Sequence, residues 1–236
     1  TIALILDIFV NPINIVGDLL FNFLHYYAWK KLANTVGVDF SEEQNEQLKG
    51  VSRVRSLEKI LTWGNKTLPE EEFMRLMAMK NEEYLSFINK MDASEVLPKV
   101  TDTLTLLNEK NQSIALGSAS KNAKPILEKV ALIDKFQAIV DGNDVSKAKP
   151  DPEVFLKGAQ LLQIDPEDCV VFEDSVAGIQ AANIANMLSI GIGEASVLHE
   201  ADYIFKDFTE IPDTFFDDII SEKIKKQPKR NLSINN

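Results

Sequence analysis

The sequence predicts an α/β fold in which a parallel β-sheet carries helices on both faces and is interrupted by an all-helical segment. Two observations predict this fold. In the second half of the chain, short apolar runs alternate with helical stretches, as in a parallel sheet wound with helices. A further apolar run opens the chain, and only helical patterns separate it from the others. We therefore expect a Rossmann-like core formed by residues 1–18 and 97–236, with residues 19–96 inserted as a helical cap.

The first strand is expected at residues 2–8, where an almost continuous apolar run is typical of a strand buried on both faces of a sheet. The other strands are predicted from similar runs, at residues 114–117, 138–140, 170–172, 188–192 and 203–205. Between them we expect helices at residues 100–108, 123–130 and 152–162, and a helix that ends near residue 186.

The inserted segment begins with a helical pattern at about residues 19–34. Ser41 and Gln44 have the spacing of a capping box, which predicts the start of a second helix. Pro69 and the acidic run that follows it predict the start of a longer helix. The apolar face of that helix is expected at Phe73, Leu76, Met77, Met79 and Tyr84.

Composition excludes several classes of protein. The 236 residues include 36 acidic and 25 basic side chains, a net charge of −11, which argues against nucleic acid or an anionic membrane as the partner. The single cysteine excludes an internal disulfide framework and a cysteine-rich metal site. No apolar run reaches the ~18 residues of a membrane span. We expect a cytoplasmic, monomeric protein.

Polar side chains follow the predicted strands at the point where each strand ends. Asp7, Ser118 and the pair Glu173–Asp174 end three of the runs, and Lys149 precedes a predicted helix. The carboxyl ends of parallel strands meet at one edge of a sheet, so these groups should converge. Crowded carboxylates suit Mg²⁺, a hydroxyl and a lysine suit a phosphoryl group, and an aspartate beside that group can attack it. The pattern predicts Mg²⁺-dependent phosphoryl transfer.

Several strings resemble those of a known family. Ile-Ala-Leu-Gly-Ser-Ala-Ser-Lys-Asn (114–122), Lys-Ala-Lys-Pro-Asp-Pro-Glu-Val-Phe (147–155) and Phe-Glu-Asp-Ser-Val-Ala-Gly-Ile-Gln-Ala (172–181) resemble the haloacid dehalogenase superfamily. In the inserted segment, Asn-Glu-Gln-Leu-Lys-Gly-Val-Ser-Arg (45–53) and Met-Lys-Asn-Glu-Glu-Tyr (79–84) are similar to the cap of its β-phosphoglucomutase branch. The resemblance covers about residues 25–211.

The resemblance implies a role for each candidate residue. Asp7 would be the nucleophile, and Ser118 and Lys149 would hold the transferring phosphoryl group. Mg²⁺ would be bound by Asp7, the backbone carbonyl of Phe9, Glu173 and Asp174. A small phosphorylated sugar would be held by His25, Arg53, Lys80, Asn81, Ala119, Ser120, Lys121 and Asn122.

The implied enzyme is an isomerase, a phosphosugar mutase that interconverts β-D-glucose 1-phosphate and glucose 6-phosphate through an aspartyl phosphate and a bisphosphate. The alternative within the same superfamily is a small-molecule phosphatase. The two differ in whether closure of the cap excludes water from the aspartyl phosphate.

The first motif departs from the family pattern. The family has Asp-x-Asp-Gly, in which the second aspartate is the general acid/base, whereas this chain has Asp7-Ile8-Phe9-Val10, and phenylalanine cannot transfer a proton. Three explanations are open: a chain without turnover, a re-routed loop in which Asp18 takes the role, or an error in the sequence over about residues 8–24. The first of these makes a catalytically impaired phosphosugar-binding protein a further alternative.

Overall fold

The computed structural model describes residues 2–7, 20–48 and 51–221, and for residues 7 and 20–25 it describes the backbone. The predictions made for Phe9, for Asp18 and for the side chains of Asp7 and His25 lie outside the described part of the chain.

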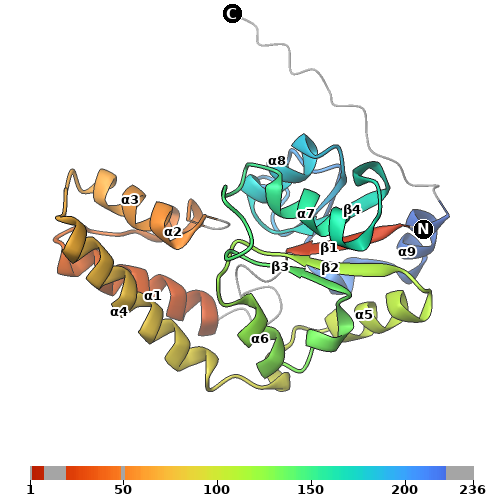
Figure 1. Ribbon diagram of the computed structural model, residues 1–236, viewed down its shortest axis with the longest axis horizontal. Coiled ribbons are helices and arrows are strands. Elements are labelled where there is room, and N and C mark those ends of the chain that lie inside the picture. Colours follow the sequence, from red (N-terminus) through yellow and green to blue (C-terminus); the bar gives the residue numbers. More distant parts are fainter. Residues whose placement is uncertain (1, 8–19, 49–50, 222–236) are drawn as a thin grey trace, which may run out of the picture.

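The core is a parallel sheet in the strand order β3-β2-β1-β4-β5-β6 (Figure 1). Its strands are β1 (Ala3–Asp7), β2 (Ser113–Gly117), β3 (Ala138–Val140), β4 (Cys169–Glu173), β5 (Leu188–Ile192) and β6 (Tyr203–Phe205). The chain builds the sheet outward from β1 in one direction and then, from β4, in the other. The carboxyl ends of β1 and β4 therefore form the switch point at which open α/β sheets bind ligands. The predicted α/β fold is confirmed.

The register brings the predicted strand-end residues to that edge. Asp7, the last residue of β1, lies opposite Glu173, the last residue of β4. On the other side of β1, Leu6 lies opposite Leu116 of β2, and Ser118 follows one residue after the end of β2.

Alternate residues of the strands supply two separate hydrophobic layers, because successive side chains of a strand point to opposite faces. Leu4 and Leu6 pack with one layer, Ala3 and Ile5 with the other. The first layer is covered by α5 (Val100–Glu109), α6 (Ala123–Lys129) and α9 (Asp213–Ile220), the second by α7 (Glu153–Leu162) and α8 (Val176–Ile184) (Figure 1). Single turns of 3₁₀ helix lie in the connections, at η1 (Ala93–Glu95), η2 (Ile133–Lys135), η3 (Pro166–Asp168) and η4 (Phe208–Glu210).

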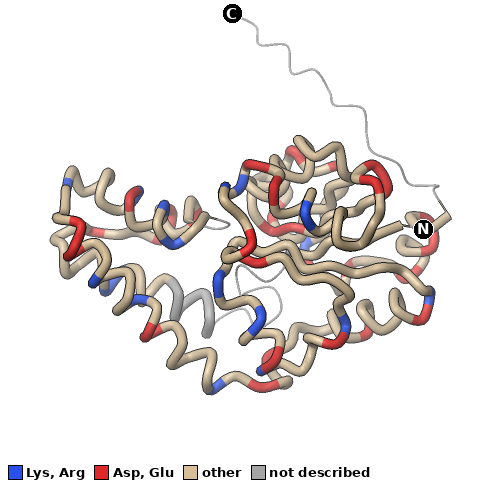
Figure 2. Tube along the Cα trace, viewed as in Figure 1, with Lys and Arg blue, Asp and Glu red and all other residues tan. Residues whose placement is uncertain are grey.

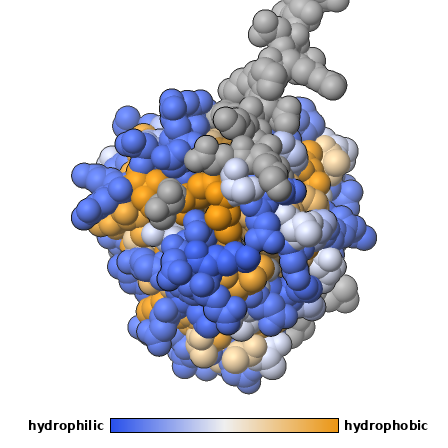
Figure 3. Space-filling model, turned by 90° about the vertical axis from the view of Figure 1, so that its right-hand side faces the viewer, coloured by the Kyte–Doolittle hydropathy of each residue, from blue (hydrophilic) through white to orange (hydrophobic). Residues whose placement is uncertain are grey.

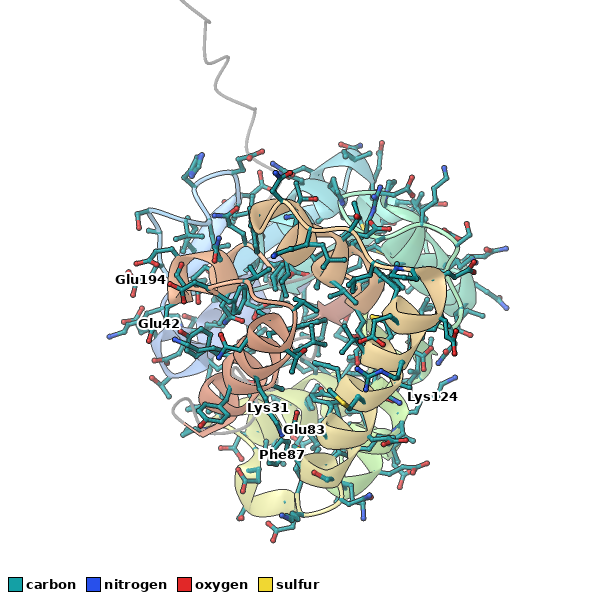
Figure 4. All side chains as sticks on the ribbon, turned by 90° about the vertical axis from the view of Figure 1, so that its left-hand side faces the viewer. Lys31, Glu42, Glu83, Phe87, Lys124 and Glu194 are labelled. Carbon is teal, nitrogen blue, oxygen red and sulfur yellow. The ribbon has the colours of Figure 1, made fainter. Side chains whose placement is uncertain are left out.

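The segment between β1 and α5 forms a helical layer beside the sheet (Figure 1). It consists of α1 (Leu20–Thr35), α2 (Glu42–Glu46), α3 (Arg53–Trp63) and α4 (Glu70–Ile88). It has a hydrophobic core of its own, centred on Trp29, Phe40 and Leu57. A salt bridge of 3.0 Å between Lys31 and Glu83 joins α1 to α4 (Figure 4).

Local signals place the starts of α2 and α4 as expected, whereas no separate signal predicted α3. Ser41 and Gln44 form the predicted capping box at the start of α2, and Pro69 directly precedes α4. The placement of Met79 on the apolar face of α4 was wrong, because its side chain is 37% exposed. The buried stripe of α4 runs instead through Leu76, Met77, Lys80, Tyr84 and Ile88, which lie on one side of a helix of 3.6 residues per turn.

Within the described ranges, no helix is long and apolar enough to cross a membrane. The end of the molecule away from the helical layer carries mostly hydrophilic side chains with hydrophobic areas between them (Figure 3). The feature that bears on function lies at the opposite side of the sheet, where the helical layer meets it.

Candidate active site

A cavity of about 320 Å³ lies between the helical layer and the carboxyl edge of the sheet. This volume lies within the ~300–1,000 Å³ range that is usual for small-molecule sites. Seven of the predicted site residues line it: Arg53, Lys80, Ala119, Ser120, Lys121, Asn122 and Lys149. The structure therefore brings together residues that are far apart in the sequence.

The charge of the cavity wall is positive. Arg53 and Lys80 contribute from the helical layer, and Lys121, Lys147 and Lys149 from the loops that follow the strands. Figure 2 shows that basic residues occur both in the helical layer and in the part of the core that faces it. Among the described residues that line the cavity, none is an aspartate or a glutamate. A protein with a net charge of −11 thus presents a locally cationic cavity, which favours an anionic ligand.

The loop after β2 is organised by short-range hydrogen bonds. The Ser118 hydroxyl accepts a hydrogen bond from the backbone N–H of Ser120 (3.2 Å), and the Ser120 hydroxyl accepts one from the N–H of Asn122 (3.2 Å). The Ser118 N–H donates to the carbonyl of Val140 (2.9 Å), which ties the loop to β3. Ser118 itself is fully buried, so that it contributes to the shape of the loop beneath the cavity.

A second loop, after β3, supports the first by close backbone packing. Gly142 approaches Ala119 so closely that an added Cβ would lie 2.4 Å from the Ala119 carbonyl oxygen. The Asn143 side-chain amide donates to the Lys121 carbonyl (3.1 Å). Only glycine fits at position 142 without displacing the loop that carries Ser120 and Lys121.

Lys149 and Glu173 form a fully buried ion pair, with side chains 1% and 0% exposed. The Lys149 Nζ donates to Glu173 Oε2 (2.9 Å) and lies 4.5 Å from the centre of the Phe155 ring. Burial lowers the pKa of Lys149, while the neighbouring Glu173 and Asp174 act in the opposite direction. The pair fixes the ammonium at the wall of the cavity.

The other oxygen of Glu173 is held by the start of α8. Glu173 Oε1 accepts hydrogen bonds from the N–H (2.8 Å) and the hydroxyl (2.6 Å) of Ser175. The Ser175 hydroxyl in turn accepts from the Gly178 N–H (3.0 Å) and caps the helix. A Cβ on Gly178 would lie 2.0 Å from the Glu173 carboxyl carbon, so glycine is required for this approach.

The donor set at the ends of β1 and β4 fits Mg²⁺. Glu173 and Asp174 supply carboxylate oxygens there, and the backbone of Asp7 lies opposite Glu173. Hard oxygen ligands of this kind suit Mg²⁺, which usually takes only one or two protein carboxylates. The Glu173 oxygens already accept three hydrogen bonds from Lys149 and Ser175, whereas Asp174 is only half-buried. Asp174 is therefore the more accessible of the two carboxylates.

Lys80 lies buried on the helical side of the cavity, between two aromatic rings. Its Nζ is 4.9 Å from the centre of the Trp29 ring and 4.6 Å from that of Tyr84. Burial and, to a smaller extent, the charge of Arg53 lower the pKa of Lys80 to about 7, while Glu83 acts in the opposite direction. Burial also lowers the pKa of Arg53 and raises that of Tyr84 well above its usual range.

Two hydrogen bonds connect the helical layer with the loop after β2. The Asn122 side-chain amide donates to Asn81 Oδ1 (3.1 Å), and Tyr84 hydrogen-bonds Ser120 through its side chain. Asn81 thus contacts the loop rather than the cavity wall. Both bonds connect α4 with residues predicted to hold the ligand.

Sequence reasoning missed several residues that line the cavity: Trp29, Asn45, Ser52, Ser56, Tyr84 and Lys147. Two signals could have found most of them: Asn45, Ser52, Tyr84 and Lys147 lie within the strings that resemble the family, and Ser56 lies three residues after Arg53. Trp29 carries no such signal, since its position depends on how α1 packs against α4. Of the other predicted residues, Glu173 and Asp174 lie behind Lys149 at the end of β4.

Three comparisons with known proteins bear on this architecture. Residues 19–186 match the sequence profile of the haloacid dehalogenase-like hydrolases. The chain belongs to this family. The match spans the helical layer, the loops that carry Ser118 and Lys149, and the end of β4 with Glu173.

Relatives within the family include both mutases and phosphatases. The chain is 38% identical to β-phosphoglucomutase of Bacillus subtilis over 79% of this chain and 84% of that protein. It is 29% identical to a fructose-1-phosphate phosphatase of Escherichia coli over 71% and 87% of the two chains. Its fold is similar to the crystal structure of β-phosphoglucomutase from Clostridium difficile, with a TM-score of 0.85, 36% identity and coverage of 94% and 97% of the two chains.

Proposed function

We propose that the protein is a phosphosugar mutase that interconverts β-D-glucose 1-phosphate and glucose 6-phosphate through an aspartyl phosphate and a bisphosphate. Its similarity to the mutases of Bacillus subtilis and Clostridium difficile covers both the sheet and the helical layer. The identity of 38% to the Bacillus subtilis mutase, against 29% to the Escherichia coli phosphatase, favours the mutase over the phosphatase.

The observation that carries the proposal is the cationic cavity between the two layers. A bisphosphate needs positive charge at both of its ends. Lys149 offers charge on the sheet side, and Arg53 and Lys80 offer it on the helical side. The loop from Ala119 to Asn122 adds Lys121 and hydroxyl and amide donors between them.

At the sheet, the proposed chemistry begins from Asp7 as the aspartyl phosphate: the free 6-hydroxyl of bound β-glucose 1-phosphate attacks its phosphorus, the Asp7 carboxylate leaves, and the hydroxyl proton passes to a base. The bisphosphate so formed turns in the cavity, and an Asp7 carboxylate oxygen attacks the phosphorus at C1, with the sugar oxygen leaving and taking up a proton to give glucose 6-phosphate. Ser118 and Lys149 would hold the phosphoryl oxygens, a role supported by the fixed position of the Lys149 ammonium. Glu173 would orient Lys149 through their ion pair.

We further propose that Mg²⁺ is bound by Asp174 and Glu173, with Asp7 and the backbone carbonyl of Phe9 as the other ligands. When bound, Mg²⁺ would offset the negative charge of the phosphoryl oxygens and of Asp7. The proposal is supported by the oxygen-only donor set and by the register that pairs Asp7 with Glu173.

The helical layer is proposed to act as a cap domain, residues 19–96, that closes over the sugar. On closure, Arg53, Lys80, Asn81 and His25 would contact the substrate from this side, as Ala119 to Asn122 would from the other. Asn81, which does not line the cavity in this structure, would then reach the sugar beside its partner Asn122. Closure would exclude water, so that the aspartyl phosphate reacts with a sugar hydroxyl. The monomeric state and the cytoplasmic location stay predictions.

Phe9 favours a second candidate, a phosphosugar-binding protein with little turnover. A general acid/base contributes about 10²–10⁴-fold to rate, and Phe9 cannot supply one. We therefore expect the Phe9→Asp variant to turn over about 10²–10⁴-fold faster than the wild-type protein.

The test is an assay with β-glucose 1-phosphate, a trace of glucose 1,6-bisphosphate and Mg²⁺. Glucose 6-phosphate is followed by a coupled dehydrogenase and inorganic phosphate by a dye assay, in wild type, Phe9→Asp and Asp7→Asn. Glucose 6-phosphate that depends on Asp7 supports the mutase. Released inorganic phosphate supports the phosphatase instead. Ligand-induced stabilisation without turnover, in both wild type and Phe9→Asp, supports the phosphosugar-binding protein.

A further inference from the structure

Trp29 has no part in the proposed chemistry, yet it lies against a residue that does. The Lys80 ammonium sits between the Trp29 ring of α1 and the Tyr84 ring of α4, at 4.9 and 4.6 Å from the ring centres. All three side chains are at least nine-tenths buried, with exposed fractions of 1%, 4% and 6% for Trp29, Lys80 and Tyr84. All three also line the cavity.

We propose that Trp29 is a positioning residue for the substrate site: together with Tyr84 it holds the Lys80 ammonium at the cavity wall, directed toward a phosphorylated ligand. This inference rests on the proposed function, because it takes the ligand of the cavity to be a phosphorylated sugar. It concerns binding and does not require that the protein turn its ligand over.

The physical reason begins with the lysine side chain. A lysine has a flexible four-carbon stem and a compact charge, so that without support it samples many rotamers. Burial of that charge is unfavourable unless neighbouring groups compensate for lost water. The faces of aromatic rings are negative, and tryptophan offers the most favourable face for a cation.

Aromatic rings and a carboxylate also differ in how far they neutralise the charge of a neighbouring lysine. Lys149, the other buried lysine of the cavity, is held by the Glu173 carboxylate at 2.9 Å, which neutralises much of its charge. The two rings beside Lys80 carry no charge of their own, so they hold the ammonium without neutralising it. In its protonated form Lys80 therefore directs a positive field at an anion, to which Arg53 adds, and a bound phosphate would favour that protonated form.

The arrangement also depends on the packing of two helices. Trp29 lies on α1 and Tyr84 one turn after Lys80 on α4, and the Lys31–Glu83 salt bridge joins the same two helices. Tyr84 in addition hydrogen-bonds Ser120 of the loop after β2. The position of Lys80 is thus set jointly by the helical layer and by the loop that faces it.

The experiment is a double-mutant cycle on ligand binding. Dissociation constants for glucose 6-phosphate are measured by calorimetry in wild type, Trp29→Leu, Lys80→Met and the double variant, with inorganic phosphate as a second probe. We expect Trp29→Leu to weaken glucose 6-phosphate binding about tenfold in the wild-type background and to have little effect in the Lys80→Met background. Trp29→Phe, which keeps an aromatic face, should retain most of the affinity.

The matched control is Trp63→Leu. Trp63 belongs to the same hydrophobic core of the helical layer and stacks on Phe40 at 6.2 Å, but it does not line the cavity. Trp63→Leu should lower Tm as Trp29→Leu does, and leave the dissociation constant unchanged. Because the chain has two tryptophans, the fluorescence of Trp29 in a Trp63→Phe background reports its contact with Lys80 directly and should change on Lys80→Met.

Three results would overturn the inference. The losses of affinity for Trp29→Leu and Lys80→Met could be additive, or Trp29→Phe could lose as much affinity as Trp29→Leu. Trp63→Leu could also bind glucose 6-phosphate as weakly as Trp29→Leu does. Absence of glucose 6-phosphate binding by the wild-type protein would overturn it as well. Failure of the proposed function is seen separately, as a wild-type protein that binds the ligand with the expected coupling and converts no β-glucose 1-phosphate.

Discussion

Two buried lysines face one cavity and are stabilised in different ways. Lys149 is paired with Glu173, and its ammonium is fixed by a carboxylate and by the Phe155 ring. Lys80 lies between the Trp29 and Tyr84 rings, and its pKa is lowered to about 7. The first lysine suits a fixed position beside a reacting group. The second carries, in its protonated form, a buried charge that a ligand can neutralise, and this charge lowers the stability of the free protein.

Because the buried Lys80 charge destabilises the folded protein, Lys80→Met should change Tm by an amount that depends on pH. The unfolded chain keeps the Lys80 proton up to about pH 10.5, whereas the folded protein releases it near pH 7. Between these values the unfolded state binds more protons, so the free energy of unfolding rises with pH, and the full cost of the buried charge is present below pH 7. We expect Lys80→Met to raise Tm at about pH 6 and the gain to shrink by about pH 9.

The measurement is calorimetric Tm at both pH values, in the absence of ligand. Lys129→Met is the matched control, because Lys129 is exposed at the end of α6. A gain in Tm that is equal at both pH values, or that Lys129→Met reproduces, would contradict the assignment of a depressed pKa to Lys80.

A second prediction compares two glycine-to-alanine variants, Gly178→Ala and Gly158→Ala. A Cβ on Gly178 would lie 2.0 Å from the Glu173 carboxyl carbon, so Gly178→Ala must displace that carboxylate. We expect a lower Tm and at least about a tenfold loss of turnover, because Lys149 loses its fixed partner. Gly158→Ala is the control: its Cβ would meet Ile5 at 3.5 Å, an ordinary contact.

Gly158 lies inside α7, where alanine is favoured over glycine by about 0.5–1 kcal/mol. Gly158→Ala should therefore leave turnover unchanged and raise the free energy of unfolding, as measured in urea. Equal turnover and equal stability of Gly178→Ala and Gly158→Ala would contradict the close contact between Gly178 and the Glu173 carboxylate.

Among elements, α8 matters most to the site because its first residues hold Glu173. The Ser175 hydroxyl donates to the Glu173 carboxylate and accepts from the Gly178 N–H, and both groups are buried. Ser175→Ala is expected to cost about 2 kcal/mol of unfolding free energy and to reduce turnover. Urea denaturation and the mutase assay measure the two effects.

Ser41→Ala serves as the comparison, since Ser41 caps α2 in the same way and lies away from the cavity. It should cost about 1 kcal/mol and leave turnover unchanged. A loss of turnover in Ser41→Ala equal to that in Ser175→Ala would attribute the effect to general destabilisation.

Elements with strong local signals could be predicted from the sequence. The capping box at Ser41, the proline before α4 and the apolar runs of the strands determine helix starts and buried strands through interactions over a few residues. Polar residues that directly follow such runs, among them Ser118 and Asp174, could be assigned to one edge of the sheet because parallel strands end there together.

The contacts between elements could not be predicted in this way. Trp29 and Lys80 are brought together by the packing of α1 on α4, and nothing in either helix alone indicates it. Met79 was placed on the buried face because it is apolar, whereas the packing of α4 gives that stripe to Lys80. A lysine buried in an apolar stripe, as Lys80 is, marks a candidate functional residue.

In the molecule as a whole, different parts provide stability and ligand binding. The sheet has a hydrophobic layer on each face, and the helical layer has a core of its own. The cavity lies where the two units meet, with cations from both and hydrogen bonds between Asn81 and Asn122 and between Tyr84 and Ser120. A ligand held by both units would stabilise their closed arrangement.

The central claim is that a phosphoryl group passes between positions of one sugar without loss to water. Phosphorus NMR of β-glucose 1-phosphate with a trace of glucose 1,6-bisphosphate, Mg²⁺ and the wild-type protein tests it most directly. We expect the glucose 6-phosphate signal to grow as that of β-glucose 1-phosphate falls, with no signal from inorganic phosphate. Inorganic phosphate as the main product, or a spectrum that does not change even with Phe9→Asp, would contradict it.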